Sequence, residues 1–128
     1  MAGIARLKRR AEFLRVAGGR RKAVTPGLIL QALERPREHA AMLNGDTDDA
    51  PRVGFTASRK VGIAVARNRA RRRLKAAAAQ VMPRHAAPGH DYVVIARLGT
   101  LKRPFPALIG DVEAALRHLG AWRAAADT

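Results

Sequence analysis

Residues 63–81 constrain the fold most, because they contain neither proline nor glycine and are rich in alanine. Proline and glycine are the strongest helix breakers, so their absence over this length favours one long helix. The apolar residues of the stretch recur every three or four positions and would form one narrow stripe along it. That stripe consists of Ile63, Ala66, Ala70, Leu74, Ala77 and Val81. The stretch therefore predicts an amphipathic helix that is buried along one side only.

The sides of this predicted helix are strongly basic. One row contains Arg67, Arg71 and Lys75, with Asn68 and Arg72 beside it, and a second row contains Arg69 and Arg73. Like charges four residues apart each cost about 0.2–0.5 kcal/mol of helix stability. A helix that needed charge only for solubility would alternate basic with acidic residues, and residues 63–81 contain no acid. We infer that a bound polyanion offsets the repulsion.

The charge of the whole chain supports this inference. The 128 residues have a formal net charge of +15. Residues 1–22 contain eight basic residues and one acid, and residues 59–75 contain eight basic residues and none, so the rest of the chain is balanced. A charge concentrated in two short segments is typical of a surface that contacts phosphates.

The remaining pattern predicts a single small α+β domain. A helix is expected over residues 7–17, with Leu7, Phe13, Leu14 and Ala17 on its apolar side, and another over residues 104–119. Strands are expected over 21–24, 28–33, 52–58 and 91–97, and the polar residues 34–51 are expected to form a hairpin loop. The predicted order is α-β-β-β-α-β-α, a small mixed four-stranded sheet packed with helices. Residues 1–120 would form one RNA-binding domain, and residues 121–128 a flexible tail.

Other functional classes find little support. The chain has no cysteine, which excludes disulfide scaffolds and thiolate metal sites. His39, His85, His90 and His118 lack metal-ligand spacing, the acids at 46–49 lack the rest of a calcium loop, and no phosphate-binding glycine motif occurs. No apolar run approaches the about 18 residues that span a membrane. The N-terminus lacks a hydrophobic signal core, which predicts a cytoplasmic protein.

Residues 58–72 read SRKVGIAVARNRARR and follow RVGFTAS at residues 52–58. This stretch resembles the signature of the bacterial ribonuclease P protein subunit, S-[KR]-[KR]-x-G-x-A-V-x-R-N-R-x-[KR]-R after a strand of the type RVGFTVS. The segment Arg6 to Lys8, Phe13, the DYVVIAR stretch at 91–97 and the closing helix also occur in the family's order. The resemblance covers residues 4–119.

The resemblance implies a protein that binds two RNAs. The helix with Arg67, Asn68 and Arg69 would lie against the catalytic RNA, with Arg71, Arg72 and Lys75 extending that surface and Arg59 and Lys60 leading into it. The first helix and the sheet would form a cleft for the 5′ leader of precursor tRNA, and Lys8, Arg9 and Phe13 match positions there. For Phe13 an ordinary core role stays an equal alternative. The family also implies a left-handed crossover between strands 52–58 and 91–97, against the general right-handed rule.

The function implied is that of a non-catalytic protein component of ribonuclease P, one per RNA and away from membranes. It would assist the catalytic RNA in cutting off the leader, with Mg²⁺ held mainly by the RNA. Three positions depart from the family pattern: Ala17 replaces a second aromatic, Lys75 replaces an arginine, and the loop at 44–50 is long and acidic. A structural RNA-binding protein such as a ribosomal protein is the alternative. A free-standing metal-dependent nuclease is disfavoured, because no acidic cluster adjoins the basic helix.

Overall fold

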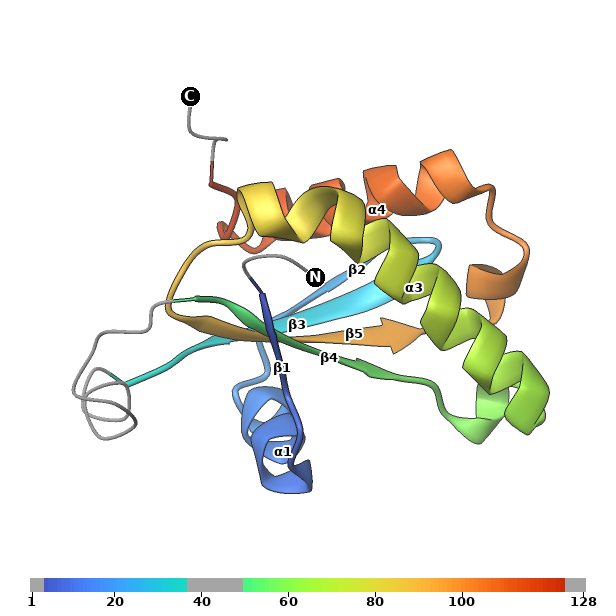
Figure 1. Ribbon diagram of the computed structural model, residues 1–128, viewed down its shortest axis with the longest axis horizontal. Helices are drawn as coiled ribbons and strands as arrows, with labels where there is room; N and C mark the ends of the chain where they lie inside the picture. Colours follow the sequence, from blue (N-terminus) through green and yellow to red (C-terminus); the bar gives the residue numbers. More distant parts are fainter. Residues whose placement is uncertain (1–3, 37–49, 124–128) are drawn as a thin grey trace.

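The computed structural model describes residues 4–36 and 50–123 and contains one five-stranded sheet with helices on both faces (Figure 1). The strands are β1 (Ala5–Arg6), β2 (Lys22–Val24), β3 (Leu28–Glu34), β4 (Arg52–Thr56) and β5 (His90–Ala96). The helices are α1 (Arg10–Gly18), α3 (Ala64–His85) and α4 (Phe105–His118), with short 3-10 turns η1 (Arg59–Val61) and η2 (Leu98–Leu101). The α+β class is therefore confirmed.

β5 lies at the centre of the sheet, in the order β1-β4-β5-β3-β2. Val94 in β5 is paired with Leu30 of antiparallel β3 on one side and with Phe55 of parallel β4 on the other. A central strand covered on both faces needs apolar residues throughout, which explains the run from Tyr92 to Ala96. β4, α3 and β5 form the expected β-α-β unit, since the two strands are parallel. The left-handedness of this crossover stays a prediction.

Two expectations about the sheet are wrong. The sheet has five strands, because Ala5 and Arg6 pair in parallel with Arg52 and Val53. Two residues are too few to show an alternating pattern, so the sequence gives no local sign of β1. The strands on either side of residues 34–51 do not form a hairpin, because β5 lies between β3 and β4. Residues 37–49, and with them most of the acidic loop at 44–50, lie outside the described residues.

The first helix is shorter than predicted and buries a different side. α1 begins at Arg10 rather than at residue 7, and its buried residue is Val16. Leu7 is buried but precedes the helix, so it does not share the helical spacing that placed Leu14 and Ala17 on the apolar side. Leu14 is 56% exposed, and Ala17 is also exposed.

The long helix confirms the prediction and extends it. α3 continues past Val81 to His85, with Pro83 in its last turn. Near a helix end proline removes only one backbone hydrogen bond, and burial of Met82 helps the last turn to persist. Ile63 precedes the helix and is 74% exposed, so the buried stripe begins at Ala70.

The helices divide between the two faces of the sheet. α3 and α4 cover one face and share a large apolar core with alternate residues of the strands, such as Leu30, Val53 and Val94. α1 lies on the opposite face, where only Leu7, Val16 and Val93 form a second, small buried cluster (Figure 1). This second face of the sheet is therefore only partly covered.

The chain remains packed just beyond the predicted domain boundary at residue 120. Ala121 is buried, and the Trp122 ring stacks on His85 with 3.9 Å between ring centroids. Residues 124–128 of the predicted tail lie outside the described residues, so the boundary itself stays a prediction. Within residues 4–36 and 50–123, no helix is both long and apolar enough to cross a membrane.

Candidate nucleic-acid interface

The exposed side of α3 carries cations that no carboxylate neutralises within the described part of the chain. The ion pairs within residues 4–36 and 50–123 involve the cations Arg15, Arg35, Arg52 and Arg103, none of which belongs to α3. The helix itself is continuous through the whole basic stretch. An unbroken row of guanidinium groups without protein counter-ions is suited to bind a phosphate backbone.

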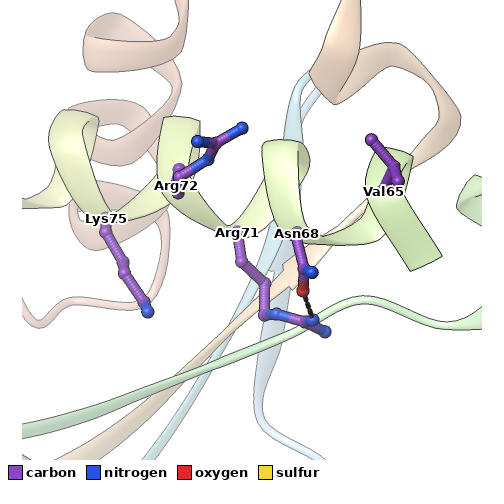
Figure 2. Close-up of a pocket in the computed structure, with 5 residues that line it drawn as sticks. All are labelled: Val65, Asn68, Arg71, Arg72 and Lys75. Carbon is purple, nitrogen blue, oxygen red and sulfur yellow. Dashed lines mark hydrogen bonds between the residues drawn. The ribbon is translucent and has the colours of Figure 1, made fainter.

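A shallow hollow of about 420 Å³ lies along this side of α3, lined by Val65, Asn68, Arg71, Arg72 and Lys75. Figure 2 shows Arg71 and Lys75 extending on the same side of the helix, with Arg72 extending away from them. The Arg71 guanidinium donates a hydrogen bond to the Asn68 side-chain oxygen, one turn earlier. Asn68 thus holds one guanidinium in place and leaves its charge uncompensated. The structure brings four of the predicted RNA-binding residues together here.

A second hollow, of about 410 Å³, opens between α1, β4 and α3. It is lined by Arg10, Phe13, Leu14, Phe55, Thr56, Ala57 and Arg71. The half-exposed Phe13 ring offers apolar surface on which a base can stack, and the two arginines can pair with phosphates. Arg71 lines both hollows, so the two surfaces are continuous.

Phe13 packs directly onto β4, where glycine makes room for it. A Cβ atom built at Gly54 would lie 2.4 Å from two carbons of the Phe13 ring and 3.2 Å from Cβ of Leu7. The ring is nevertheless half-exposed and lines the second hollow. Phe13 therefore packs against the sheet and also offers a face to the hollow, and a role in binding the leader stays a prediction.

Lys8 and Arg9 lie just before α1 and are exposed. Their backbone N–H groups donate to Glu12 Oε1 over 3.1 and 2.9 Å, an arrangement that caps the start of the helix. The second hollow is lined by the next residue, Arg10, and not by Lys8 or Arg9; Arg10 was not among the predicted site residues. Its position three residues before Phe13 puts both on one face of the helix predicted over residues 7–17, and this spacing is the signal that could have identified it.

The predicted residues Arg59 and Lys60 lie in η1 and are exposed. Gly62 follows with φ of +146°, a conformation that favours glycine, and so turns the chain into α3. Neither cation lines either hollow. They extend the basic surface beyond the start of the helix.

The second row of α3 arginines divides into two kinds. Arg69 is exposed, whereas Arg73 donates from Nε to the Thr100 carbonyl over 3.1 Å and from Nη2 to the Arg103 carbonyl. Arg73 therefore ties α3 to the segment around η2. Periodicity could not separate the two, because the acceptors come from a distant part of the chain.

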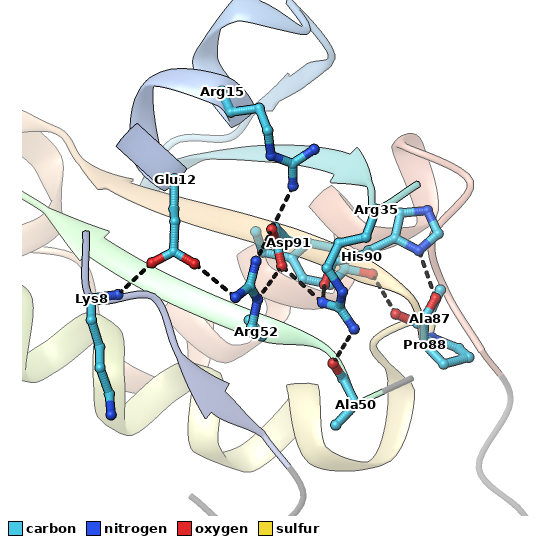
Figure 3. A network of polar contacts seen from close by, with 11 residues as sticks. Lys8, Glu12, Arg15, Arg35, Ala50, Arg52, Ala87, Pro88, His90 and Asp91 are labelled. Atoms are coloured by element: carbon cyan, nitrogen blue, oxygen red, sulfur yellow. Dashed lines mark hydrogen bonds and ion pairs between the residues drawn. The ribbon is translucent and has the colours of Figure 1, made fainter. Parts of the chain in front are cut away.

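A polar network with the buried Asp91 at its centre attaches α1 to the sheet (Figure 3). Asp91 accepts hydrogen bonds from Arg15, Arg35 and Arg52 over 2.5–2.8 Å. Burial acts to raise the pKa of Asp91, but the hydrogen bonds from the three guanidiniums outweigh burial and lower the pKa. This network was not predicted from the sequence, because Asp91 stands only as the first residue of a predicted strand.

Glu12 belongs to the same network, because its Oε2 lies 2.7 Å from Arg52 Nη1. Burial acts to raise the pKa of Glu12, while the backbone N–H groups of Arg9 and Lys8 and the charge of Arg52 lower it overall. Hydrogen bonding to Asp91 raises the pKa of Arg52. Each of these shifts favours the charged form, so Glu12, Asp91 and Arg52 stabilise one another's charges.

Comparisons with known proteins identify close relatives. A family model described as Ribonuclease P matches residues 1–120. The chain is 56% identical over 123 residues to the ribonuclease P protein component of Paramagnetospirillum magneticum, covering 94% of this chain and 86% of the relative. It is 49% identical over 115 residues to that of Gluconacetobacter diazotrophicus, covering 90% of each.

Solved structures share the fold. The RNase P protein from Staphylococcus aureus superposes with a TM-score of 0.70 at 21% identity, covering 92% of this chain and 97% of that one. The RNase P protein from Thermotoga maritima superposes with a TM-score of 0.65 at 19% identity, covering 85% and 92%.

Proposed function

This chain belongs to the ribonuclease P family, and from that premise we propose how its two hollows divide the work of a protein component in tRNA processing. The α3 surface, defined as Arg67, Asn68, Arg69, Arg71, Arg72 and Lys75, binds the catalytic RNA. The hollow between α1, β4 and α3, here called the leader hollow, holds the single-stranded 5′ leader of precursor tRNA. One protein acts per RNA.

The observation that carries the α3 assignment is the row of cations without protein counter-ions in the described chain. Holding such charges close together costs helix stability unless an anion offsets the repulsion. RNA supplies phosphates in a continuous row and releases counter-ions when arginines replace them, which drives binding. Arg59 and Lys60 continue the same surface from η1.

The leader assignment rests on the mixture of aromatic and cationic groups in the second hollow. The half-exposed Phe13 offers ring surface, while Phe55 is buried with the Arg6 guanidinium over its ring; stacking contributes about 1–3 kcal/mol per base without strong sequence preference. Arg10 and Arg71 stand beside the rings and can hold the phosphates of the same nucleotides. Lys8 and Arg9, exposed just before α1, add charge along the path of the strand.

The bond cleavage belongs to the RNA subunit. Among the described residues, no group of three histidine or acidic side chains is placed to hold a metal ion, so we derive no protein-held metal site. Mg²⁺ on the RNA would supply an activated water for hydrolysis. The protein contributes position and charge: its arginines reduce the repulsion between two polyanions. Location in the cytoplasm stays a prediction.

Reconstitution with the RNA subunit and precursor tRNA tests the proposal. Arg67→Ala and Arg71→Ala should each raise the Mg²⁺ concentration needed for half-maximal cleavage, because each removes a charge that offsets phosphate repulsion. Arg84→Ala is the matched control, since Arg84 is an exposed arginine on the last turn of the same helix and lines neither hollow. Equal Mg²⁺ requirements for all three variants would refute the assignment of the α3 surface.

A further inference from the structure

We propose that a ring of three ion pairs, closed through the backbone of α1, positions α1 over the sheet and so sets the shape of the leader hollow. The ring consists of Glu12, Arg52, Asp91 and Arg15. This inference rests on the proposed function, since it assigns a purpose to the position of α1. None of the four side chains lines the hollow, so they are positioning residues rather than contact residues.

The ring begins and ends on α1 (Figure 3). Glu12 Oε2 lies 2.7 Å from Arg52 Nη1, and Arg52 binds Asp91 through Nε and Nη2 over 2.7 and 2.6 Å. Asp91 Oδ2 then accepts from Arg15 Nη2 over 2.5 Å. Glu12 and Arg15 are three residues apart, one turn of α1, so both ends of the ring act on the same helix face.

The apolar contact beneath α1 is too small to define its orientation alone. Only Leu7, Val16 and Val93 are buried in that cluster, whereas α3 and α4 share the large core on the opposite face. Apolar contacts are non-directional, but two ion pairs at different points of one helix turn define both its rotation and its distance from the sheet. The ring therefore fixes the orientation of α1 on the sheet, which the small apolar cluster alone does not.

The position of α1 reaches the leader hollow through two short connections. Glu12 accepts the backbone N–H groups of Lys8 and Arg9 and so holds the basic segment before the helix. Phe13 follows Glu12 directly and sits against Gly54 without spare space. A tilt of α1 would therefore displace the aromatic wall and the neighbouring cations together.

Arg35 holds the sheet side of the ring in place. It donates to Asp91 Oδ1 over 2.8 Å and to the carbonyls of His90 and Ala50 over 3.0 and 2.7 Å. Asp91 thus stays fixed even when contacts from α1 are removed. Removal of Asp91 would instead leave three guanidiniums around a site without its carboxylate, so Glu12 is the better residue to change.

The test uses the reconstituted ribonucleoprotein and compares precursor tRNA with a leader to the same tRNA without one. Glu12→Ala should reduce the affinity gain from the leader about tenfold, equivalent to part of one base stack. Glu12→Gln keeps one oxygen acceptor for the two backbone N–H groups but places an amide NH2 where Oε2 faces Arg52; it therefore removes the ion pair and keeps the cap, and its loss should be smaller. Affinity for the RNA subunit should not change, because the α3 surface is untouched.

Asp111→Asn is the matched control. Asp111 is also a buried carboxylate, and it pairs with Arg103 over 2.9 and 3.0 Å, but it lies on α4 across the sheet from α1. It should lower stability without changing the gain from the leader. A loss of leader affinity in this control equal to that in Glu12→Ala would overturn the inference, because general destabilisation would then explain both.

A distance measurement separates positioning from binding. The chain has no cysteine, so spin labels can be attached at Ala11→Cys on α1 and Ala79→Cys on α3, both exposed positions. Their distance distribution should broaden with Glu12→Ala or Glu12→Gln and stay narrow with Asp111→Asn. An unchanged distribution, or an unchanged gain from the leader, overturns the inference. A wild-type protein that shows no gain from the leader would instead overturn the proposed function.

Discussion

The contact between Phe13 and Gly54 allows a quantitative prediction for Gly54→Ala. The added Cβ would lie 2.4 Å from two ring carbons, whereas ordinary contacts begin near 3.4 Å. The ring must therefore retreat by about 1 Å, or the strand must move. Neither can happen freely, because Leu7 stands 3.2 Å from the same Cβ position. Overpacking of this kind costs about 1–3 kcal/mol.

One opposing effect reduces this loss. Alanine restricts the unfolded chain more than glycine does, which is worth about 0.4–1 kcal/mol in favour of folding. Gly54 does not adopt a positive φ angle, so backbone strain adds nothing. The expected net loss in the free energy of unfolding is about 1–2 kcal/mol, measured by urea denaturation with an unchanged slope. Leader affinity should fall as well, because the displaced ring is a wall of the leader hollow.

Two comparisons make the result interpretable. Gly110→Ala is the matched control, because Gly110 is exposed within α4 and has no atoms within 4 Å of an added Cβ; it should gain about 0.5–1 kcal/mol. Phe13→Leu in the Gly54→Ala background should relieve the clash, so the double variant should be more stable than the sum of the single effects. Wild-type stability of Gly54→Ala, or strict additivity of the pair, would refute the close packing described here.

Three further outcomes follow from the structure. Arg73→Ala should lower the free energy of unfolding by about 1–2 kcal/mol, because its guanidinium donates hydrogen bonds to two carbonyls. Arg72→Ala should leave the urea midpoint unchanged and weaken RNA binding. Equal stability of the two variants would contradict the different orientations of these side chains. Because the pKa of Asp91 lies below its ordinary 3.8, its carboxylate should stabilise the fold from neutral pH down to about pH 4 and lose this effect only below that. The urea midpoints of the wild type and of Asp91→Asn, measured as the pH is lowered, check this. A difference between the two midpoints that shrinks already at pH 6 would contradict it. Affinity for the RNA subunit should fall about 10³–10⁵-fold between 50 and 200 mM salt, with a slope about one unit smaller in Arg67→Ala, as filter binding would show; a flat salt response would contradict phosphate contacts.

Local patterns were sufficient for the elements whose own consecutive residues carry a repeated apolar pattern. α3 was predicted because Ala70, Leu74 and Ala77 recur at helical spacing, and burial confirms them. β5 was predicted as a strand, since residues 92–96 are an apolar run, and it is the central strand of the sheet. In both cases the property that defines the element is present in consecutive residues.

The missed features depend on partners that are distant in sequence. β1 is a strand only because β4 lies beside it, and Arg73 differs from Arg69 only because two carbonyls near η2 accept from it. Asp91 gathers arginines from α1, β4 and the end of β3, which no local spacing could reveal. The glycine at position 54 was a local sign of the close packing of Phe13, since glycine inside a strand indicates a close approach by another group.

Arg71 lines both hollows, and under the proposed function this makes their occupancies interdependent. A phosphate of one RNA that draws the Arg71 guanidinium toward itself withdraws it from the other, or presents it at a better angle. By thermodynamic reciprocity, if the catalytic RNA changes the affinity for the substrate strand by some factor, the substrate strand changes the affinity for the catalytic RNA by the same factor. The free protein and the assembled ribonucleoprotein should therefore bind the same short oligonucleotide with different affinities.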